Sequence, residues 1–423
     1  MVTTEASASH GRIRRARTAV RRAALLALLL VLAACGEPAT SEGAGESGGG
    51  SASGGATDAP GGADAGGGEP GGTETGADAG DDESAAALDE VYAAVEGLDA
   101  DARREALIEL ALEAGPLNLY ASTNPDDAEV QHAQFTDLTG VEIEHYRGNA
   151  TSIRNRMLQE FEAGAPGADA IVMDGTEMAA IDDEGLLLPM DSPYLEDYPD
   201  SAVFGNWAAP TSNAYVATWN TDALAPEDVP TSWREVLEFD GPWAVEIADF
   251  DWFATLVMHH FMAEEGMTED EAVELFRTGV SNATPVDGHT LLVELLIAGE
   301  FDLVSSAYHH RVRSVISEDG APIGWDQPSA VEPVVLRPSG VAIARGADNP
   351  AAALLFADFL LSPEGQQSYV DLNRTPNSNA IEGGISPDIE TIPVDLEAAT
   401  QDREKWESLY EEVVNGTTQD VRA

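Results

Sequence analysis

The chain has 423 residues, and 76 acidic residues against 21 lysines and arginines give it a formal net charge of −55. A surface this acidic repels nucleic acid and anionic lipid headgroups, which excludes DNA and RNA as partners. The single cysteine excludes an intramolecular disulfide, so a folded domain must depend on its hydrophobic core. The length leaves room for two lobes of ordinary size.

The first 34 residues have the pattern of a targeting segment, here a signal peptide. Arginines between positions 12 and 22 precede an apolar run, Ala23 to Ala34, that is too short for a permanent membrane span. The run ends in Leu32-Ala33-Ala34-Cys35, which resembles the lipobox of bacterial lipoproteins. The resemblance implies cleavage before Cys35 and lipidation of its sulfur, which would anchor the chain to a membrane outside the cytoplasm. An ordinary signal peptide with a cysteine nearby is the alternative.

Residues 35–83 are expected to form the lipidated cysteine and a flexible tether. From Gly36 to about Gly80 the chain is mainly Gly, Ala, Ser, Asp and Glu, and it has almost no large apolar residue. Such a segment cannot bury enough surface to offset the entropy cost of ordering. Order is predicted to begin near Ser84, because apolar residues then recur at helical spacing through an N-terminal helical segment, 84–113.

Residues 114–220 alternate strand and helix patterns, and we expect them to form the first part of lobe 1. The predicted strands lie at 117–120, 141–144 and 168–173. Asn124 followed by Pro125 is typical of a helix start, and Thr176 is expected to cap a later helix. This order predicts an open, mostly parallel sheet flanked by helices.

Residues 221–330 repeat the alternation and are expected to form lobe 2. Here the predicted strands lie at 243–247, 283–286 and 301–308, with helices at 251–262 and 290–298. Residues 331–423 are expected to cross back in extended form and to end in helices that lie mostly on lobe 1. Candidate hinges are the strands that pass between the lobes, near 213–220 and 331–344.

Several segments resemble, in the same order, the extracellular solute-binding proteins of ABC importers, most of all the group that binds ferric ions and related small ligands. The matching segments are Leu117–Asn124, Thr139–Val141, Arg147–Gly148, Ala168–Asp169, Glu184–Leu187, Gly320–Pro322, Pro338–Ala342 and Phe359–Gln366. The resemblance implies a two-lobed α/β fold of the periplasmic-binding-protein type (type II). In that fold each lobe is an open, mainly parallel sheet flanked by helices, with the ligand cleft between the lobes. It also implies a monomer that delivers a small molecule or ion to an ABC permease.

Open α/β sheets bind ligands beyond the carboxyl ends of their strands, where helix N-termini converge. For the Ser, Thr and Asn side chains selected by this rule, helix capping alone is the alternative use. The candidate ligand-binding residues are Ser122, Thr123, Asn124, Asn149, Thr151, Ser152, Asp174, Gly175, Asp251, His289, Thr290, Tyr308 and His310.

The segment Tyr308-His309-His310 leaves a metal ion and an organic ligand both open. Ferric-binding relatives carry adjacent tyrosines at the matching strand end and a carboxylate at the position of Asp174. The resemblance therefore implies Tyr308, His309 and Asp174 as Fe(III) ligands. However, His309 replaces the second tyrosine, and Ser122 stands where some ferric binders have a histidine. A small polar organic ligand or anion is the alternative, with Tyr308 as a hydrogen-bond donor.

Two other classes of protein compete with a binding protein. An enzyme is not expected, because the sequence has no Gly-x-Ser-x-Gly, His-Glu-x-x-His or phosphate-loop motif. A surface adhesin would be favoured by internal repeats, which the sequence lacks. The expected mechanism is therefore closure of two lobes around a ligand. No cofactor is expected besides that ligand.

Overall fold

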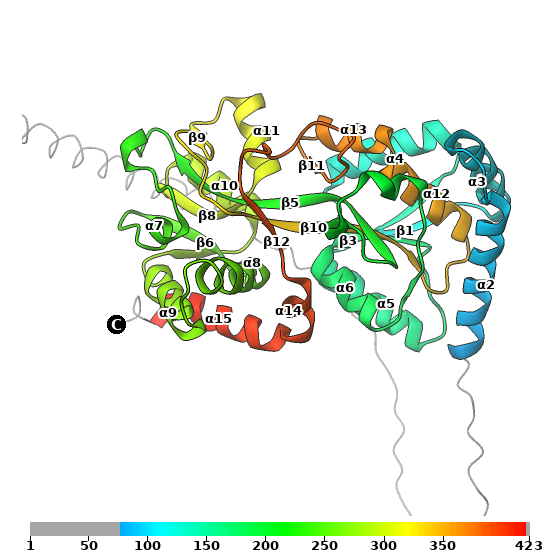
Figure 1. The fold of residues 1–423 in the computed structure, drawn as a ribbon, viewed down its shortest axis with the longest axis horizontal. Helices are drawn as coiled ribbons and strands as arrows, with labels where there is room; N and C mark the ends of the chain where they lie inside the picture. The colour runs from blue at the N-terminus through cyan, green and yellow to red at the C-terminus, as the bar shows by residue number, and fades with distance from the viewer. Residues whose placement is uncertain (1–76, 420–423) are drawn as a thin grey trace, which may run out of the picture. The chain divides into compact units, whose positions relative to one another are not determined.

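Two long antiparallel strands run through the middle of the structure and join its two lobes (Figure 1). The computed structural model describes residues 77–419, and all of them belong to one compact unit. Strands β5 (Trp207–Asn220) and β10 (Val334–Ala344) pair with each other from Trp207–Ala342 to Tyr215–Val335. They contain most of the two predicted hinge segments.

Lobe 1 consists of the elements that pack against the Trp207 end of β5 and the Ala344 end of β10. Strand β1 lies between β2 and β3 in parallel, and β3 joins β10 in antiparallel. The strands are β1 (Leu117–Ala121), β2 (Ile143–Arg147), β3 (Ala170–Asp174), β4 (Leu187–Leu188) and β11 (Thr375–Pro376). The helices are α2 (Ala77–Val95), α3 (Ala100–Ala114), α4 (Pro125–Thr139), α5 (Ala150–Glu162), α6 (Gly175–Asp183), η1 (Pro193–Asp197), η2 (Asp200–Ala202), α12 (Pro350–Leu361) and α13 (Pro363–Asp371).

Lobe 2 consists of the elements at the other end of these two strands. Strand β6 lies between β7 and β8 in parallel, and β8 joins β5 in antiparallel. The strands are β6 (Trp243–Glu246), β7 (Thr284–Val286), β8 (Leu303–Tyr308) and β9 (Ile323–Gly324), and β12 (Thr391–Pro393) pairs with β10. The helices are η3 (Pro226–Asp228), α7 (Trp233–Leu237), α8 (Phe250–Thr255), its π-helical continuation η4 (Leu256–Met262), α9 (Glu269–Val280), α10 (His289–Ala298), α11 (His309–Asp319), α14 (Leu396–Gln401) and α15 (Arg403–Gln419).

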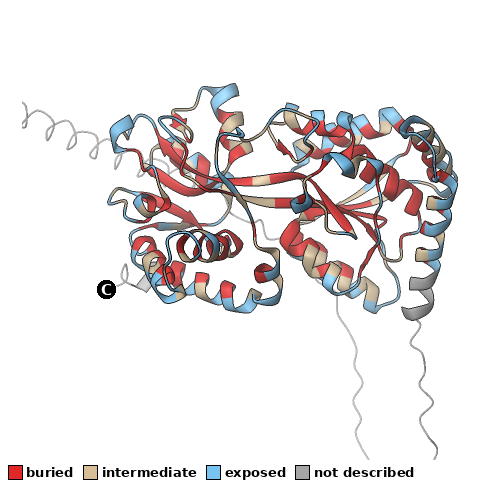
Figure 2. Ribbon diagram, viewed as in Figure 1, coloured by how far each residue is buried: buried red, intermediate tan, exposed pale blue. Residues whose placement is uncertain are grey.

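Most strands of the sheet are buried on both faces, as Figure 2 shows, because helices cover each side of the sheet. The edge strands β2 and β7 are partly exposed. In lobe 2 alternate residues of one strand enter two separate cores. Tyr215, Ala217 and Trp219 of β5 pack in one core, whereas Ala214 and Val216 pack in the other. This follows from the two-residue period of a strand. The predicted two-lobed α/β architecture is confirmed.

The boundaries differ from the sequence expectation at both ends. Helix α2 begins at Ala77, within the segment 35–83 that was expected to be tether. The prediction that the C-terminal helices lie mostly on lobe 1 is wrong for α15. Its Trp406 and Tyr410 are buried in a lobe 2 core, where their rings pack against Phe253. The signal peptide, Cys35 and most of the predicted tether lie outside the described residues.

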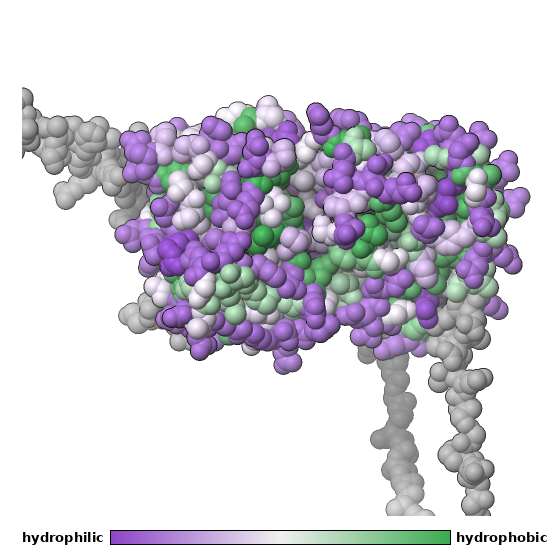
Figure 3. All heavy atoms as spheres, viewed as in Figure 1, coloured by the Kyte–Doolittle hydropathy of each residue, from purple (hydrophilic) through white to green (hydrophobic). Residues whose placement is uncertain are grey.

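The face in Figure 3 is mostly hydrophilic, and its hydrophobic patches gather towards the middle, where the lobes meet. Among the described residues, no helix has both the length and the apolar character needed to cross a membrane.

Candidate functional site

A cavity of about 450 Å³ lies between the lobes and is lined by residues of both. It lies beside β5 and β10, which contribute residues near their midpoints. Its lining includes Ser122, Thr123, Asn124, Pro125, Asp127, Gln131, Arg147, Gly148, Asn149, Ala150, Val172, Asp174, Thr211, Asn213, Gly288, His289, Thr290, Tyr308, His310, Arg337, Ser339, Tyr369 and Arg374.

On lobe 1 the cavity is bounded by loops that lead from strands into helices. The side chain of Asn124 accepts a hydrogen bond from the Asp126 amide at 3.0 Å and caps α4. Asn149 caps α5 in the same way, through the Ser152 amide at 2.7 Å. The cap of α6 is Asp174, not the predicted Thr176. Helix N-termini carry partial positive charge, so these ends favour an anion in the cavity.

On lobe 2 the cavity wall is a stack of aromatic rings. The imidazole of His289, the first residue of α10, lies 3.6 Å from the Tyr308 ring, centre to centre. The ring of Tyr308 is in turn 5.5 Å from that of His310. Burial raises the pKa of Tyr308, although the charge of Arg337 opposes the shift. Tyr308 therefore presents a neutral phenol to the cavity at physiological pH.

Three arginines reach the cavity, and sequence reasoning missed all three. Arg337 lies in the middle of β10, with a side chain that is 14% exposed. Its guanidinium donates to the Tyr308 hydroxyl and lies 3.5 Å from Asp251 Oδ2. Two sequence signals were available: the family match at Arg147–Gly148, and the scarcity of basic residues, which number 21 against 76 acidic residues in the chain. The cavity lining reverses that ratio, with three arginines against two aspartates.

The other two arginines lie on lobe 1. The Arg374 Nε donates to Asp127 Oδ2 at 2.8 Å, and its Nη1 donates to Asn213 Oδ1 at 3.1 Å. Arg147 is exposed, and its Nε donates to the Thr123 carbonyl at 3.1 Å. Within the described residues Arg147 has no carboxylate partner. Its charge is therefore available to a bound ligand.

The structure brings most of the predicted ligand-binding residues together around this cavity. The predicted residues that line it are Ser122, Thr123, Asn124, Asn149, Asp174, His289, Thr290, Tyr308 and His310. Thr151 and Asp251 instead line a neighbouring cavity of about 700 Å³, which shares Asp174 and Arg337 with the first. Ser152 is exposed on α5 and lines neither cavity. Gly175 is buried, and a Cβ there would lie 2.7 Å from Pro338 Cγ.

The predicted metal set of Tyr308, His309 and Asp174 is not assembled. Only Tyr308 and Asp174 line the cavity. His309 is 1% exposed, and its ring packs edge-on against Trp325 with 4.7 Å between the centres. Consecutive side chains at the end of a strand point to opposite sides, so His309 faces the core when Tyr308 faces the cavity.

Replacing His309 with glutamine should make the stability of the fold less sensitive to acid. Burial first, and then the charge of Arg313, lower the pKa of His309 from the ordinary histidine value of about 6.5 to about 3. Between these values the unfolded chain binds a proton that the folded chain does not. Acidification below about pH 6.5 therefore destabilises the fold through this residue, by up to about 1.4 kcal/mol per pH unit. In urea unfolding between about pH 7 and 4, the free energy of unfolding should fall less steeply with decreasing pH for H309Q than for the wild type. Parallel curves for the two proteins would contradict the assignment.

Comparison with known proteins places the chain among binding proteins. Residues 131–390 match a family described as bacterial extracellular solute-binding protein. Iron-bound HitA from Pseudomonas aeruginosa has a TM-score of 0.59 at 18% identity, covering 71% of this chain and 99% of that chain. AfuA from Actinobacillus pleuropneumoniae, with exogenous fructose-6-phosphate bound, has a TM-score of 0.60 at 20% identity, with coverages of 71% and 99%. MotA from A. tumefaciens B6, in complex with glucopine, scores 0.57 at 17% identity, again covering 71% and 99%. No curated protein matches the chain.

These structures hold chemically different ligands, so the shared fold does not identify the ligand of this chain. The family match is decisive at a coarser level, because it covers more than half of the chain and extends over both lobes. It confirms the resemblance found in the sequence and excludes a catalytic class, since this is a family of binding proteins. The chain thus belongs to the bacterial extracellular solute-binding proteins and is the solute-binding component of an ABC uptake system.

Proposed function

We propose that the protein captures a small organic anion, with a phosphate or carboxylate group, and delivers it to an ABC permease. The observation that carries this proposal is the set of three arginines, Arg147, Arg337 and Arg374, around one cavity. Guanidinium groups bind phosphate and carboxylate through paired hydrogen bonds. The N-termini of α4, α5 and α6 add partial positive charge on the lobe 1 side.

A bare ferric ion fits this lining less well. Fe(III) favours phenolate and carboxylate oxygens. The Tyr308 hydroxyl instead accepts a hydrogen bond from Arg337, and the pKa of Tyr308 is raised by burial. With His309 turned away, Asp174 and Tyr308 are too few to hold the ion. Three nearby guanidinium groups would also repel a trivalent cation.

Capture is proposed to proceed by closure of the lobes about β5 and β10. Contacts between the lobes already exist beside the cavity. The Thr176 hydroxyl on α6 donates to Asp251 Oδ2 on α8 at 3.0 Å. The Arg403 Nη2 on α15 donates to Glu177 Oε1 on α6 at 3.0 Å. An anion that contacts arginines of lobe 1 and of β10 together would favour the closed form.

The N-terminal pattern supports a membrane-bound site of action. Lipidation of Cys35 would tether the folded part to the outer side of a membrane. The acidic, low-complexity segment that follows would let the lobes reach the permease.

The proposal is tested by thermal unfolding of the purified chain with a panel of ligands in a phosphate-free buffer. Fructose 6-phosphate, glucose 6-phosphate and citrate serve as anionic probes, with fructose as the uncharged control. At least one anion should stabilise the fold, by about 2.7 kcal/mol at a hundredfold excess over Kd. Ferric ion as the nitrilotriacetate complex is the competing probe. A visible tyrosinate-to-iron band, lost in Tyr308→Phe, without stabilisation by any anion, would reject the proposal in favour of iron.

A further inference from the structure

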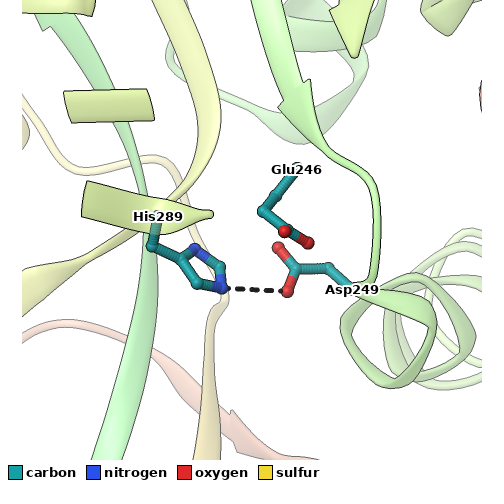
Figure 4. Close-up of side chains that lie close together, drawn as sticks. All are labelled: Glu246, Asp249 and His289. Atoms are coloured by element: carbon teal, nitrogen blue, oxygen red, sulfur yellow. Dashed lines mark ion pairs between the residues drawn. The ribbon is translucent and has the colours of Figure 1, made fainter. Parts of the chain in front are cut away.

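Glu246, Asp249 and His289 come together in lobe 2 behind the aromatic wall of the cavity. Glu246 ends β6, Asp249 lies in the loop before α8, and His289 begins α10. One possible ligand atom of each residue lies within 4.8 Å of the others. Figure 4 shows the two carboxylates and the imidazole directed towards one another. Two buried carboxylates beside one imidazole favour an added positive charge.

The hydrogen bonds leave one carboxylate oxygen of this cluster unsatisfied. Both oxygens of Glu246 accept backbone amides, from Gly288 at 3.0 Å and from Ala248 at 2.5 Å. Asp249 Oδ1 lies 3.2 Å from His289 Nε2. Asp249 is 1% exposed, and its Oδ2 has no hydrogen-bond partner within residues 77–419. Burying a carboxylate oxygen without a hydrogen-bond partner costs free energy, and a ligand bound to this oxygen would offset that cost.

The orientation of His289 suits metal binding. Its Nδ1 lies 2.9 Å from the carbonyl oxygen of Ser306. A carbonyl oxygen can only accept, so Nδ1 carries a hydrogen and donates it. In the neutral imidazole, Nε2 then has its lone pair directed at the carboxylates. Metal-ligating histidines generally have such a partner, which fixes the tautomer and the ring orientation. Stacking on Tyr308 holds the ring in the same place.

We propose that Glu246, Asp249 and His289 bind one divalent transition-metal ion, with Zn²⁺ as the preferred species. One imidazole nitrogen and two carboxylate oxygens form a donor set that suits Zn²⁺ better than Mg²⁺ or Ca²⁺, which prefer oxygen alone. The two positive charges neutralise the two carboxylates. This site adjoins the proposed anion site: His289 lines that cavity, whereas Glu246 and Asp249 lie behind it and do not. Its role is to rigidify the lobe 2 wall of the cavity.

The test is a Zn²⁺ titration of the purified chain after treatment with a chelator, at neutral pH and without added anionic ligand. Isothermal titration should give one Zn²⁺ per chain with micromolar or tighter affinity, and the ion should raise Tm. Mg²⁺ at the same concentration should not. Asp249→Asn and Glu246→Gln should each weaken binding by at least about 100-fold, because loss of even an outer partner costs 10- to 100-fold.

A matched control removes another histidine–carboxylate pair. His259 Nε2 lies 2.8 Å from Asp395 Oδ2 at a more exposed position, and among residues 77–419 no second acid completes a metal site there. Asp395→Asn should therefore bind Zn²⁺ as the wild type does. If a proton on His289 is the natural occupant instead, no stoichiometric Zn²⁺ binding will be measured, and the proposal fails.

A second measurement needs no variant and so does not depend on whether Asp249→Asn folds. Crystals of the wild-type chain grown with Zn²⁺ should show an anomalous peak, at the zinc absorption edge, between Glu246, Asp249 and His289. An anomalous peak only elsewhere, or no peak, would overturn the assignment. Failure here leaves the anion proposal untouched, because the ligand panel contains no Zn²⁺.

Discussion

Replacing Arg337 with alanine should reduce affinity for the anion that stabilises the wild-type chain by about 2–5 kcal/mol, the usual cost of truncating a buried partner of a charge. Arg337 is the only arginine of the cavity lining that comes from the strands joining the lobes. Its guanidinium contacts Asp251 and Tyr308, and it lies 5.2 Å from the centre of the Tyr215 ring. These contacts fix the guanidinium against lobe 2, so an anion held by Arg337 together with Arg147 or Arg374 of lobe 1 would bridge the lobes. Isothermal titration with the selected anion measures the loss.

Two further variants make this experiment specific. Arg337→Lys keeps the charge but loses the bidentate hydrogen bonding. Its affinity for the anion should therefore lie between those of the wild type and Arg337→Ala. Arg277→Ala removes a half-buried arginine that pairs with Glu274 and Glu412 and does not line the cavity, so this variant should bind the anion as the wild type does. Far-UV circular dichroism checks that each variant is folded. Wild-type affinity in a folded Arg337→Ala chain would remove this residue from the site.

Replacing Arg103 with alanine should lower the free energy of unfolding by about 3–5 kcal/mol, because it leaves a buried carboxylate without its counter-ion. The Arg103 Nε on α3 donates to Asp358 Oδ2 on α12 at 2.7 Å. Both side chains are nearly buried, at 10% and 8% exposure. Burial raises the pKa of Asp358 and Arg103 opposes that shift, so removing the arginine leaves the cost of burial alone. Chemical denaturation measures the change.

The neighbouring residue provides the matched control. Arg104 also lies on α3 and pairs with a carboxylate, Glu364 at 3.4 Å, but that side chain is 54% exposed. Solvent screens such a pair, so Arg104→Ala should cost no more than about 1 kcal/mol. Equal losses for the two variants would show that helix propensity, and not burial of the ion pair, sets the effect.

The order of strands and helices was predictable because it depends on residues close in sequence. Asn124-Pro125 does begin a helix, as local capping chemistry requires. The exact first and last residues of each strand were harder to predict. The strand predicted at 141–144 lies at Ile143–Arg147, because its register is set by pairing with Leu117–Ala121 of β1. The sequence shows the alternation, but not which residues find a partner.

Only part of the cavity lining was predictable, because the sequence again shows local patterns but not long-range contacts. The rule that ligands bind beyond the carboxyl ends of strands selects residues between a strand and the next helix. It correctly identified most of the lobe 1 loops and the aromatic wall of lobe 2. Arg337 lies inside a strand, where that rule does not apply. Arg374 reaches the cavity by pairing with Asp127, 247 positions away in sequence. Neither position carries a local signal, because only the crossing of the chain between the lobes brings these two arginines to the cavity.

The attachment of the terminal helices has a practical consequence. Helix α2 packs against α3 and α12 on lobe 1, whereas α15 packs against α8 and α9 on lobe 2. A fluorescent donor on α2 and an acceptor on α15 would therefore be carried by different lobes. Energy transfer between the two dyes would report the proposed closure in real time and would make the protein an optical sensor for its own solute.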